Sequence, residues 1–383
     1  MIMEQENQAL INTTLELVKI DSRNRPHGED EIAAYISDFL EKIKIDNVVI
    51  THEKERKSLI AYYPGTESCK NLLMCGHLDT INLDSVSGPD NQIKAGIKAG
   101  KMFGLGTSDM KGGLAGMLYA LKELVKRNYK PRYDIYFAFT GDEEADKAGA
   151  LHLLENELTN NTKLMIVGEP TNLNLGLGSK GQIWFEIKFR GKAAHGSTPD
   201  KGKSAILMAM NFISELLNPD FFVKNDRFFP KSTVNIGFIN ALGPFNVVPD
   251  TCLVGVDIRL SPPETVDNVI KKIKEILAST LKKSEYELKI VDSLDASFVQ
   301  PESKMAKEIK KIIGAHVSGK RKIALSYATD GSVLNTYASI PVIILGPGIP
   351  EVIHNRDEYI PLENIISSAK IYTDIMLNVG KII

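Results

Sequence analysis

The chain has 383 residues, and at ~150 residues per domain this length predicts two or three domains with substantial hydrophobic cores. Hydrophobic residues make up 43% and charged residues 25% of the sequence, which excludes collagen-like, coiled-coil and largely disordered proteins. The 46 Lys and Arg nearly balance the 48 Asp and Glu, so no overall basic field would attract nucleic acid or anionic lipid. We therefore expect a globular protein that binds any anionic ligand through local groups.

The sequence favours a cytoplasmic protein. Its hydrophobic runs fall far short of the ~20 residues of a membrane-spanning helix, and the first residues lack the basic and apolar parts of a signal peptide. The three cysteines, Cys69, Cys75 and Cys252, form no CxxC pair, which is typical of a reducing compartment. We expect them to be small buried hydrophobic side chains.

Helices and strands alternate in the first half of the chain. Amphipathic patterns predict helices over 4–18 and 30–43, and short apolar segments then predict strands over 58–63, 71–76, 134–140 and 163–168. Helical patterns over 112–127 and 147–157 separate the last three of these strands. Such alternation predicts an α/β fold with a doubly wound, mainly parallel sheet. Residues 84–100, rich in Gly, Asn and Asp, predict a long surface loop.

A different pattern begins after Ser179. It predicts a strand over 183–190, a helix over 203–217, strands over 232–239 and 252–260, a helix over 264–281 and a strand over 286–291. The order β-α-β-β-α-β is typical of a ferredoxin-like α+β domain. The α/β pattern then resumes with a helix over 303–313, strands over 322–326 and 341–345, and a helix over 362–379. The sequence therefore predicts one α/β domain formed by residues 1–179 and 294–383, with an inserted domain at 180–293.

Acidic residues and histidines follow four of the predicted strands: His77, Asp79, Glu143, Glu144, Glu169 and His354. Asp109 lies in a glycine-rich stretch directly before a helix. Ligands of open α/β sheets bind beyond the carboxyl ends of the strands, so these side chains are expected to converge. Converging carboxylates repel one another unless cations neutralise them. Two histidines and several carboxylates without cysteine fit a catalytic site for two divalent ions, Zn²⁺ first and Co²⁺ or Mn²⁺ as alternatives, with Asp109 as the bridge.

Each of these signals has an ordinary alternative. A His-x-Asp pair is common on surfaces and in cores, and a Glu-Glu pair is common at a solvated helix start. Gly104 and Gly106 before a helix could belong to a phosphate-binding loop, but the stretch lacks the full GxGxxG order and the acidic residue ~20 positions later. The conjunction of four clusters at four strand ends favours the metal site.

The motifs GHLDT, GLGTSDMKGG, TGDEE, GEPT and HNRDEY, in this order along nearly the whole chain, resemble those of zinc-dependent acetylornithine deacetylases, succinyl-diaminopimelate desuccinylases, aminoacylases and carboxypeptidase relatives. The resemblance implies that His77 and Glu169 hold one metal, that Glu144 and His354 hold the other, and that Asp109 bridges them. It also implies that Asp79 orients His77, that Glu143 is the general base, and that the Asp109–Met110 peptide is cis. A metal lowers the pKa of its bound water to ~7, and a carboxylate base adds ~10²- to 10⁴-fold in rate.

By the same resemblance, His195 would polarise the scissile carbonyl across a dimer interface. The ordinary alternative is that His195 is a solvent-exposed side chain without a catalytic role. Asn246 and Arg259 correspond to contacts with the oxyanion and the substrate carboxylate, and a strand-end salt bridge is the alternative for Arg259. Thr329 and Gly331 belong to a stretch that resembles a further carboxylate-binding loop. Ser332 follows that stretch where many relatives have Arg.

The sequence thus predicts a two-metal amidohydrolase that cleaves an N-acyl-amino acid and forms a homodimer through the inserted dimerisation, or lid, domain. A di- or tripeptidase or carboxypeptidase of the same family is the alternative within this class. From another class, the chain could be a catalytically silent metal-binding scaffold, but the intact Glu143 and the complete ligand set argue against it. Neither nucleic acid nor membrane is expected as a partner.

Overall fold

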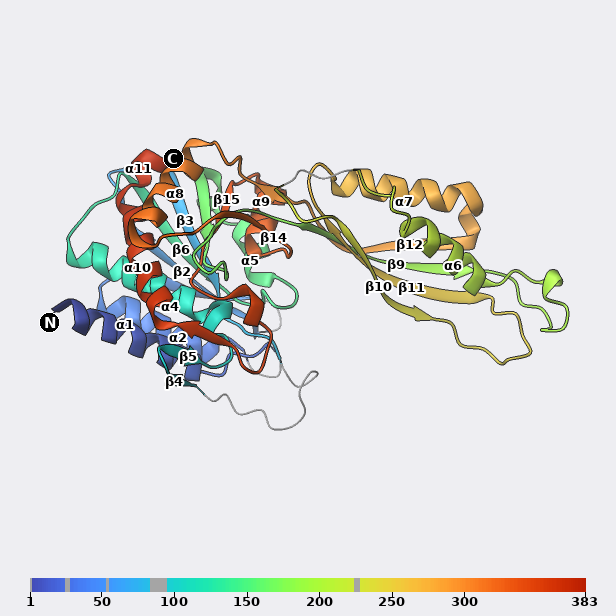
Figure 1. The fold of residues 1–383 in the computed structure, drawn as a ribbon, viewed down its shortest axis with the longest axis horizontal. Coiled ribbons are helices and arrows are strands. Elements are labelled where there is room, and N and C mark those ends of the chain that lie inside the picture. The colour runs from blue at the N-terminus through green and yellow to red at the C-terminus, as the bar shows by residue number, and fades with distance from the viewer. Residues whose placement is uncertain (1, 25–27, 53–54, 83–94, 224–227) are drawn as a thin grey trace. The chain divides into compact units, whose positions relative to one another are not determined.

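The computed structural model describes residues 2–24, 28–52, 55–82, 95–223 and 228–383, and the chain divides into two compact units (Figure 1). The large unit consists of Met1–Gly178, Ser297–Ile323 and Thr329–Ile383. The inserted unit consists of Ser179–Ala296 and Ala324–Ala328. No helix in the described part of the chain is long and apolar enough to cross a membrane.

Nine strands of the described chain form one sheet in the order β1-β2-β6-β3-β7-β15-β8-β13, with β14 paired to β8. Their bounds are β1 (Asn47–Thr51), β2 (Lys57–Tyr63), β3 (Glu67–His77), β6 (Tyr133–Thr140), β7 (Thr162–Val167), β8 (Leu175–Ser179), β13 (Ser297–Phe298), β14 (Lys322–Leu325) and β15 (Val342–Ile344). The central strands β6, β3, β7 and β15 are parallel, and β1, β2 and β8 add antiparallel pairs. The prediction of a mainly parallel sheet is confirmed.

Helices pack on this sheet in two groups (Figure 1). One group contains α1 (Ile2–Lys19), α4 (Gly112–Lys126), α8 (Lys304–His316), α10 (Leu362–Leu377) and the short α11 (Val379–Ile382). α2 (Asp30–Lys42) packs on β1 and β2 and meets α4 through Phe39 and Tyr119, whose ring centroids lie 5.7 Å apart. The other group consists of α5 (Ala148–Leu154), which packs on α9 (Asp330–Ala338). Because α4 packs on β3 and α9 packs on β3 and β7, helices surround the parallel strands as the predicted α/β class requires.

Several short elements differ from the sequence predictions. A three-stranded sheet of β4 (Gly96–Lys98), β5 (Lys101–Phe103) and β16 (Tyr359–Pro361) begins inside the predicted loop at 84–100, of which 84–94 lies outside the described residues. These strands, like β1, are too short to show a hydrophobic period of their own. Cys69 is exposed, contrary to the expectation, whereas Cys75 and Cys252 are buried.

The inserted unit is a four-stranded antiparallel sheet covered by two helices. Its elements are β9 (Gly181–Arg190), α6 (Ala205–Leu216), β10 (Thr233–Asn240), β11 (Thr251–Leu260), α7 (Val266–Thr280) and β12 (Tyr286–Leu294), and the sheet order is β10-β11-β9-β12. The predicted ferredoxin-like order is confirmed. Both helices begin at a hydroxyl cap, because the side chains of Ser204 and Thr265 accept backbone N–H groups three residues later.

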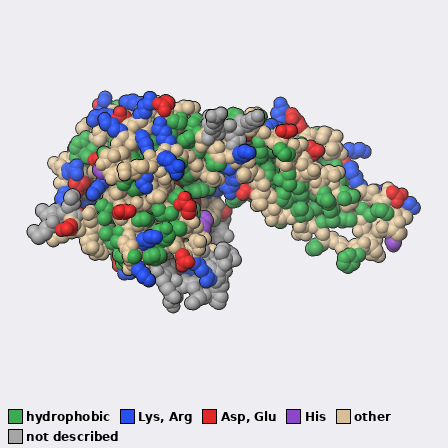
Figure 2. All heavy atoms as spheres, in the orientation of Figure 1, with side chains coloured by type: hydrophobic (Ala, Val, Ile, Leu, Met, Phe, Trp, Pro, Cys, Tyr) green, Lys and Arg blue, Asp and Glu red, His purple; other side chains and the backbone are tan. Residues whose placement is uncertain are grey.

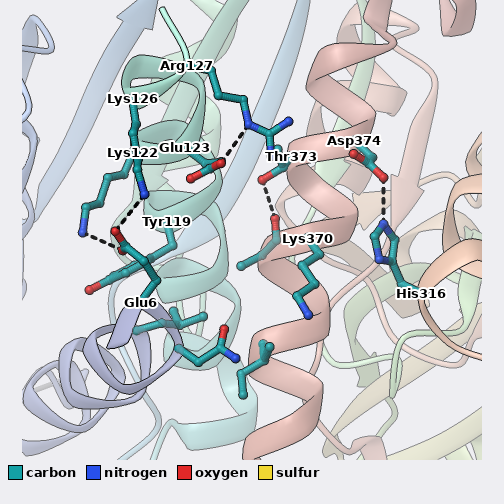
Figure 3. Close-up of a pocket in the computed structure, with 14 residues that line it drawn as sticks. Glu6, Tyr119, Lys122, Glu123, Lys126, Arg127, His316, Lys370, Thr373 and Asp374 are labelled. Carbon is teal, nitrogen blue, oxygen red and sulfur yellow. Dashed lines mark hydrogen bonds and ion pairs between the residues drawn. The ribbon is translucent and has the colours of Figure 1, made fainter. Parts of the chain in front are cut away.

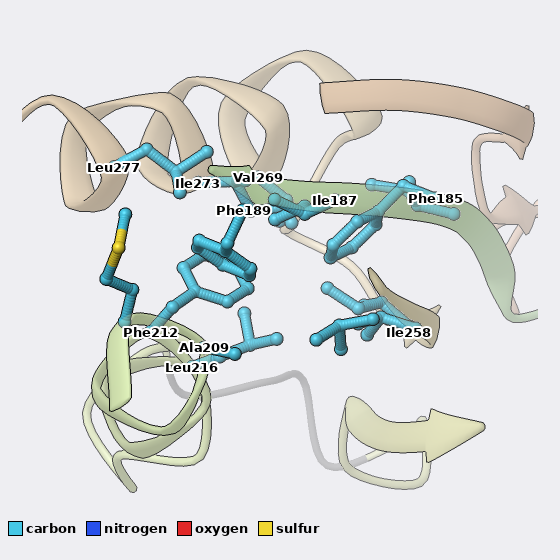
Figure 4. Packing of buried hydrophobic residues seen from close by; sticks show 14 of the residues in the cluster. Phe185, Ile187, Phe189, Ala209, Phe212, Leu216, Ile258, Val269, Ile273 and Leu277 are labelled. Carbon is cyan, nitrogen blue, oxygen red and sulfur yellow. The ribbon is translucent and has the colours of Figure 1, made fainter. Parts of the chain in front are cut away.

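One hydrophobic core holds the inserted unit together (Figure 4). Alternate residues of β9 are buried, and α7 contributes residues spaced by four: Ile183, Phe185, Ile187, Phe189, Val269, Ile273 and Leu277. The strand period of two and the helix period near four therefore aim both elements at the same core. Phe212 of α6 packs against Phe189, with ring centroids 5.8 Å apart.

Candidate metal centre

The ends of three parallel strands bring the predicted acids and histidines to one edge of the large sheet. His77 is the last residue of β3 and pairs in register with Thr140, the last residue of β6. Cys75 pairs with Val167, so β7 also ends at this level, two residues before Glu169. Parallel strands end on the same side, and this geometry collects side chains that are far apart in the sequence.

Asp109 and His354 complete the cluster from two loops. Asp109 lies in the tight turn Thr107–Lys111 that leads into α4, and its peptide bond to Met110 is cis, as the resemblance implies. Asp109 Oδ1 lies 3.0 Å from His77 Nε2, and Asp109 Oδ2 lies 3.3 Å from His354 Nε2. The carboxylate of Asp109 therefore stands between two imidazole rings, with one oxygen directed at each.

A second carboxylate accompanies each histidine. Glu169 Oε1 lies 3.6 Å from His77 Nε2, and Glu144 Oε1 lies 3.2 Å from His354 Nε2. Ligand atoms of His77, Asp109 and Glu144 lie within 4.8 Å of one another, and so do those of His77, Glu143 and Glu169. A donor set of imidazole and carboxylate groups without thiolate fits Zn²⁺, Co²⁺ or Mn²⁺ in a catalytic rather than a structural site.

The electrostatics of the cluster reflect its crowded acids. Burial raises the pKa of both Glu143 and Glu169 well above the usual carboxyl value, and the charge of Asp109 adds to the effect on Glu169. Hydrogen bonds to Asp109 and Glu144 raise the pKa of His354 to about 10. Burial would lower the pKa of His77, but the neighbouring carboxylates raise it well above its usual value. A bound cation would take over the neutralisation of these carboxylates.

Asp79 makes contacts that differ from its expected role. His77 Nδ1 lies 2.8 Å from the backbone oxygen of Asp79 and 3.9 Å from its carboxylate. The carboxylate of Asp79 instead accepts the backbone N–H groups of Glu143, at 3.1 Å, and Glu144, at 3.2 Å. The backbone of Asp79 thus holds the imidazole, and its side chain holds the loop after β6.

Two buried charged residues that the sequence analysis did not single out hold the turn of Asp109. The carboxylate of Glu358 accepts N–H groups from Gly106, Ser108 and Asp109 at 3.0, 2.7 and 3.0 Å, and burial raises its pKa to about 7. Lys111 Nζ donates to the Ile20 oxygen at 2.7 Å, and burial lowers its pKa to about 8. Lys111 lies in the motif GLGTSDMKGG and Glu358 lies in the motif HNRDEY. Their positions in these motifs are the sequence signal that could have identified them.

The inserted unit brings two of its three predicted residues together. His195 and Asn246 are exposed, and their loops are joined because the N–H of Gly196 donates to the backbone oxygen of Asn246 at 2.7 Å. Asn246 lies in the loop before β11, whereas Arg259 lies near the far end of that strand. Arg259 pairs with Asp257 at 2.9 Å, which is the salt bridge considered as its alternative role.

Thr329 and Gly331 form the start of α9 rather than an open loop. The Thr329 hydroxyl accepts the N–H of Gly331 at 3.2 Å, and Ser332 Oγ accepts the N–H of Thr329 at 3.1 Å. Asp330 between them is buried, and its Oδ2 accepts a hydrogen bond from the Thr140 hydroxyl at 2.5 Å. Thr329 and Ser332 are therefore engaged in capping the helix, and Asp330 Oδ2 in holding the end of β6.

A separate pocket of about 400 Å³ lies among α1, α4, α8 and α10 of the large unit (Figure 3). Several of its charged side chains form ion pairs: Lys122 and Lys126 with Glu6 and His316 with Asp374 between helices, and Arg127 with Glu123 at the end of α4. None of its lining residues belongs to the predicted metal or substrate sites.

Several proteins resemble this chain over most of its length. Acetylornithine deacetylase of Buchnera aphidicola subsp. Acyrthosiphon pisum (strain 5A) is 29% identical over 353 residues, which cover 88% of each protein. Among solved structures, aminopeptidase PepT of Bacillus cereus has a TM-score of 0.80 at 23% identity, covering 98% of this chain and 99% of that chain. A tripeptidase of Staphylococcus aureus subsp. aureus Mu50 has a TM-score of 0.78 at 26% identity, covering 98% of both chains.

The family model for peptidase family M20/M25/M40 matches residues 73–378. This range contains the whole metal-ligand cluster and the inserted unit. The deacetylase relative and the family description agree with the class of enzyme that the sequence motifs predict. The chain therefore belongs to peptidase family M20/M25/M40 and is a metal-dependent amidohydrolase or peptidase.

Proposed function

We propose that the large unit binds two divalent metal ions, with Zn²⁺ as the favoured metal, and hydrolyses the amide bond of an N-acyl-amino acid. The observation that carries this proposal is the contact of Asp109 with two histidines, one on each carboxylate oxygen. Each histidine has a further carboxylate beside it, so the donors divide into two half-sites that share Asp109. This division favours two ions with a bridging carboxylate over one ion with surplus ligands.

The chain's own groups divide the work of hydrolysis. His77 and Glu169 would hold one ion, Glu144 and His354 the other, and the bound ions would supply Lewis-acid activation of water and of the scissile carbonyl. Glu143 would take a proton from the attacking water and pass it to the leaving amine nitrogen. Its backbone N–H is fixed by the Asp79 carboxylate, so the position of the base is set before substrate binds.

The substitution Glu143→Gln tests whether Glu143 acts as the general base or as a metal ligand. The test is needed because Glu143 also lies within reach of His77 and Glu169. We expect kcat to fall at least ~10³-fold, about 4 kcal/mol of barrier, while elemental analysis finds the wild-type metal content. Glu155→Gln, which changes an exposed glutamate after α5, is the matched control and should leave both quantities unchanged. Loss of one ion per chain in Glu143→Gln would make Glu143 a ligand.

His354→Ala or Asp109→Ala should lose both metal and activity, because each variant lacks a proposed metal ligand. Elemental analysis and the activity assay measure the two effects.

The second candidate function is a di- or tripeptidase, which the resemblance to PepT and to the tripeptidase favours. The acetylornithine deacetylase relative favours the acyl-amino acid instead. A panel of N-acetyl and N-succinyl amino acids together with di- and tripeptides, assayed with Zn²⁺, Co²⁺ and Mn²⁺, decides between them by kcat/KM. A catalytically silent scaffold would bind metal and turn over none of these compounds.

We further propose that the inserted unit forms a homodimer contact. Its strand β10 is at the edge of the sheet, and large hydrophobic side chains are exposed on α6, on β10 and in the loop after β10: Leu207, Met210, Phe238, Ile239, Leu242 and Phe245. Figure 2 shows hydrophobic side chains gathered on this part of the chain. An exposed apolar face and an unpaired strand edge favour a two-fold contact with a second copy.

The cytoplasmic location of the protein stays a prediction from the sequence.

A further inference from the structure

A cluster of buried polar side chains lies behind residues 141–144, the loop that carries the proposed base. It contains Asn24, Glu29, Arg56, Asp79 and Asp142, each at most 8% exposed. The five residues come from four different segments of the large unit, and no role follows from their sequence positions except that of Asp79. Burying charged groups is costly, so such a cluster persists only where its charges are paired and hydrogen-bonded.

The carboxylates of this cluster hold three successive backbone amides of the loop. Glu29 Oε1 accepts the N–H of Asp142 at 3.2 Å. Asp79 accepts the N–H of Glu143 on Oδ1 at 3.1 Å and that of Glu144 on Oδ2 at 3.2 Å. Asp142 has a φ of +68°, in the left-handed region, so the chain leaves the strand here and its amides need partners outside the sheet. The two side chains supply them.

Arg56 holds these carboxylates in place. Its Nη2 forms a close ion pair with Glu29 Oε1. The other two carboxylates are in charge contact without a hydrogen bond: Nη2 lies 3.9 Å from Asp79 Oδ2, and Nε, which has no hydrogen-bond partner, lies 3.4 Å from Asp142 Oδ1. Asn24 Nδ2 donates to Asp79 at 2.8 Å and to Asp142 at 3.1 Å, but it adds no positive charge. Within this cluster of described residues, the guanidinium is therefore the cation that offsets the repulsion of three buried carboxylates.

We propose that Arg56 is a positioning residue: through Glu29, Asp79 and Asp142 it fixes the backbone of residues 142–144 and so the placement of Glu143 and Glu144. The kinetic part of this inference rests on the proposed function of Glu143. A planar guanidinium presents its N–H donors in a fixed fork, whereas a lysine ammonium is a compact point charge on a flexible stem. A misplacement of ~1 Å at a catalytic group costs ~10²-fold in rate, so the loop has little tolerance.

Hydrogen exchange measured by mass spectrometry tests the structural part without any substrate. In Arg56→Met we expect the amides of 142–144 to exchange at least ~10-fold faster than in the wild type, because their acceptors are no longer held. Arg127→Met is the matched control, since this exposed arginine directly after α4 also pairs with a carboxylate, Glu123 at 2.8 Å. It should leave these amides unchanged. Unchanged exchange in Arg56→Met would overturn the proposal.

Arg56→Lys covers the case in which Arg56→Met does not fold. It keeps the positive charge and removes the fork, so we expect the variant to fold with exchange at 142–144 between the wild-type rate and that of a free loop. Wild-type exchange in Arg56→Lys together with wild-type kcat would show that charge alone is sufficient, which contradicts the positioning by the fork.

Kinetics at saturating metal test the catalytic part. We expect Arg56→Met to lower kcat ~10- to 100-fold with KM within about twofold of the wild type. In the Glu143→Gln background the same change should lower the residual kcat by clearly less than in the wild-type background, because only the placement of Glu144 remains to be lost. An equal loss in both backgrounds would overturn the positioning of Glu143 by Arg56. If the wild type hydrolyses nothing in the panel, the proposed function fails, and the exchange result still decides whether Arg56 holds the loop.

Discussion

Buried carboxylates serve two different purposes in the large unit. Asp109, Glu144 and Glu169 direct their carboxylate oxygens at the two histidines. The carboxylates of Asp79 and Glu358 instead accept hydrogen bonds from backbone N–H groups. Both kinds follow strands or precede them in the sequence, so residue type and spacing do not separate a ligand from a support. Only the direction of each side chain in the folded chain does.

Glu358→Ala tests the support of the Asp109 turn. The substitution leaves three buried N–H groups without their acceptor, and each such group costs ~1–3 kcal/mol. We expect the free energy of unfolding of the large unit to fall by about 3 kcal/mol or more, measured by urea titration followed by circular dichroism. Metal affinity should fall as well, because Asp109 belongs to the same turn.

Glu351→Ala is the control for this experiment, since Glu351 is exposed and lies in the same segment between β15 and β16. It should change the unfolding free energy by no more than ~0.5 kcal/mol. Equal stability of the two variants would mean that the turn is held by other contacts and that Glu358 is dispensable.

At the scale of elements, the close approach of α4 and α10 depends on Gly116. A Cβ at this position would overlap Ser368 Oγ and come within 3.1 Å of Tyr372 Cε2. Glycine inside a helix costs ~1 kcal/mol relative to alanine, so its presence in α4 needs a packing reason. The contact with α10 supplies it.

We expect Gly116→Ala to lower the stability of the large unit by ~1–3 kcal/mol despite the gain in helix propensity, because the new methyl group overpacks the helix pair. Thermal unfolding measures the effect. Adding Ser368→Ala should recover part of the loss, since it removes the atom that the methyl group meets.

Gly314 of α8 provides the matched control, because a Cβ there meets nothing within 4 Å. Gly314→Ala should therefore raise stability, by up to ~1 kcal/mol. A stabilising effect of Gly116→Ala would show that α4 and α10 can separate at no cost, and it would refute the packing argument.

At the scale of the whole molecule, the proposed residues are divided between the two units. The metal cluster and Glu143 belong to the large unit, and His195 and Asn246 belong to the inserted unit. If His195 serves the active site of a partner subunit, two inactive variants should complement each other. Mixing His195→Ala with Glu143→Ala subunits should then regenerate activity, because one site of each heterodimer pairs an intact Glu143 with an intact His195.

Steady-state activity of the mixture, compared with each variant alone, measures the complementation. Up to about one quarter of the wild-type activity is expected after full subunit exchange, since half of the dimers are mixed and each has one intact site. Subunit exchange is verified separately with two tagged forms of the chain. No recovery despite exchange would place the action of His195 in its own subunit or remove it from the mechanism.

Sequence alone predicted the elements and clusters whose signals are local. The β-α-β-β-α-β order of the inserted unit follows from hydrophobic periods of two and near four, which each segment carries by itself. The convergence of His77, Glu143 and Glu169 also followed, because parallel strands end at one edge whatever their order in the sheet. The sequence does not predict α9, which begins at Asp330 behind the cap Thr329, since nine residues with few hydrophobic side chains show little helical period.

Tertiary structure decided what depends on contacts between distant segments. Arg56, Glu29 and Asn24 have ordinary neighbours in the sequence, and they acquire a common purpose only where the folded chain brings them against the loop after β6. Glu358 likewise meets the turn of Asp109 across about 250 positions. Such contacts carry no periodic signal, because each is a single pairing specified by the fold as a whole. The sequence therefore determined which groups could do the chemistry, and the tertiary structure determined which of them hold the others in place.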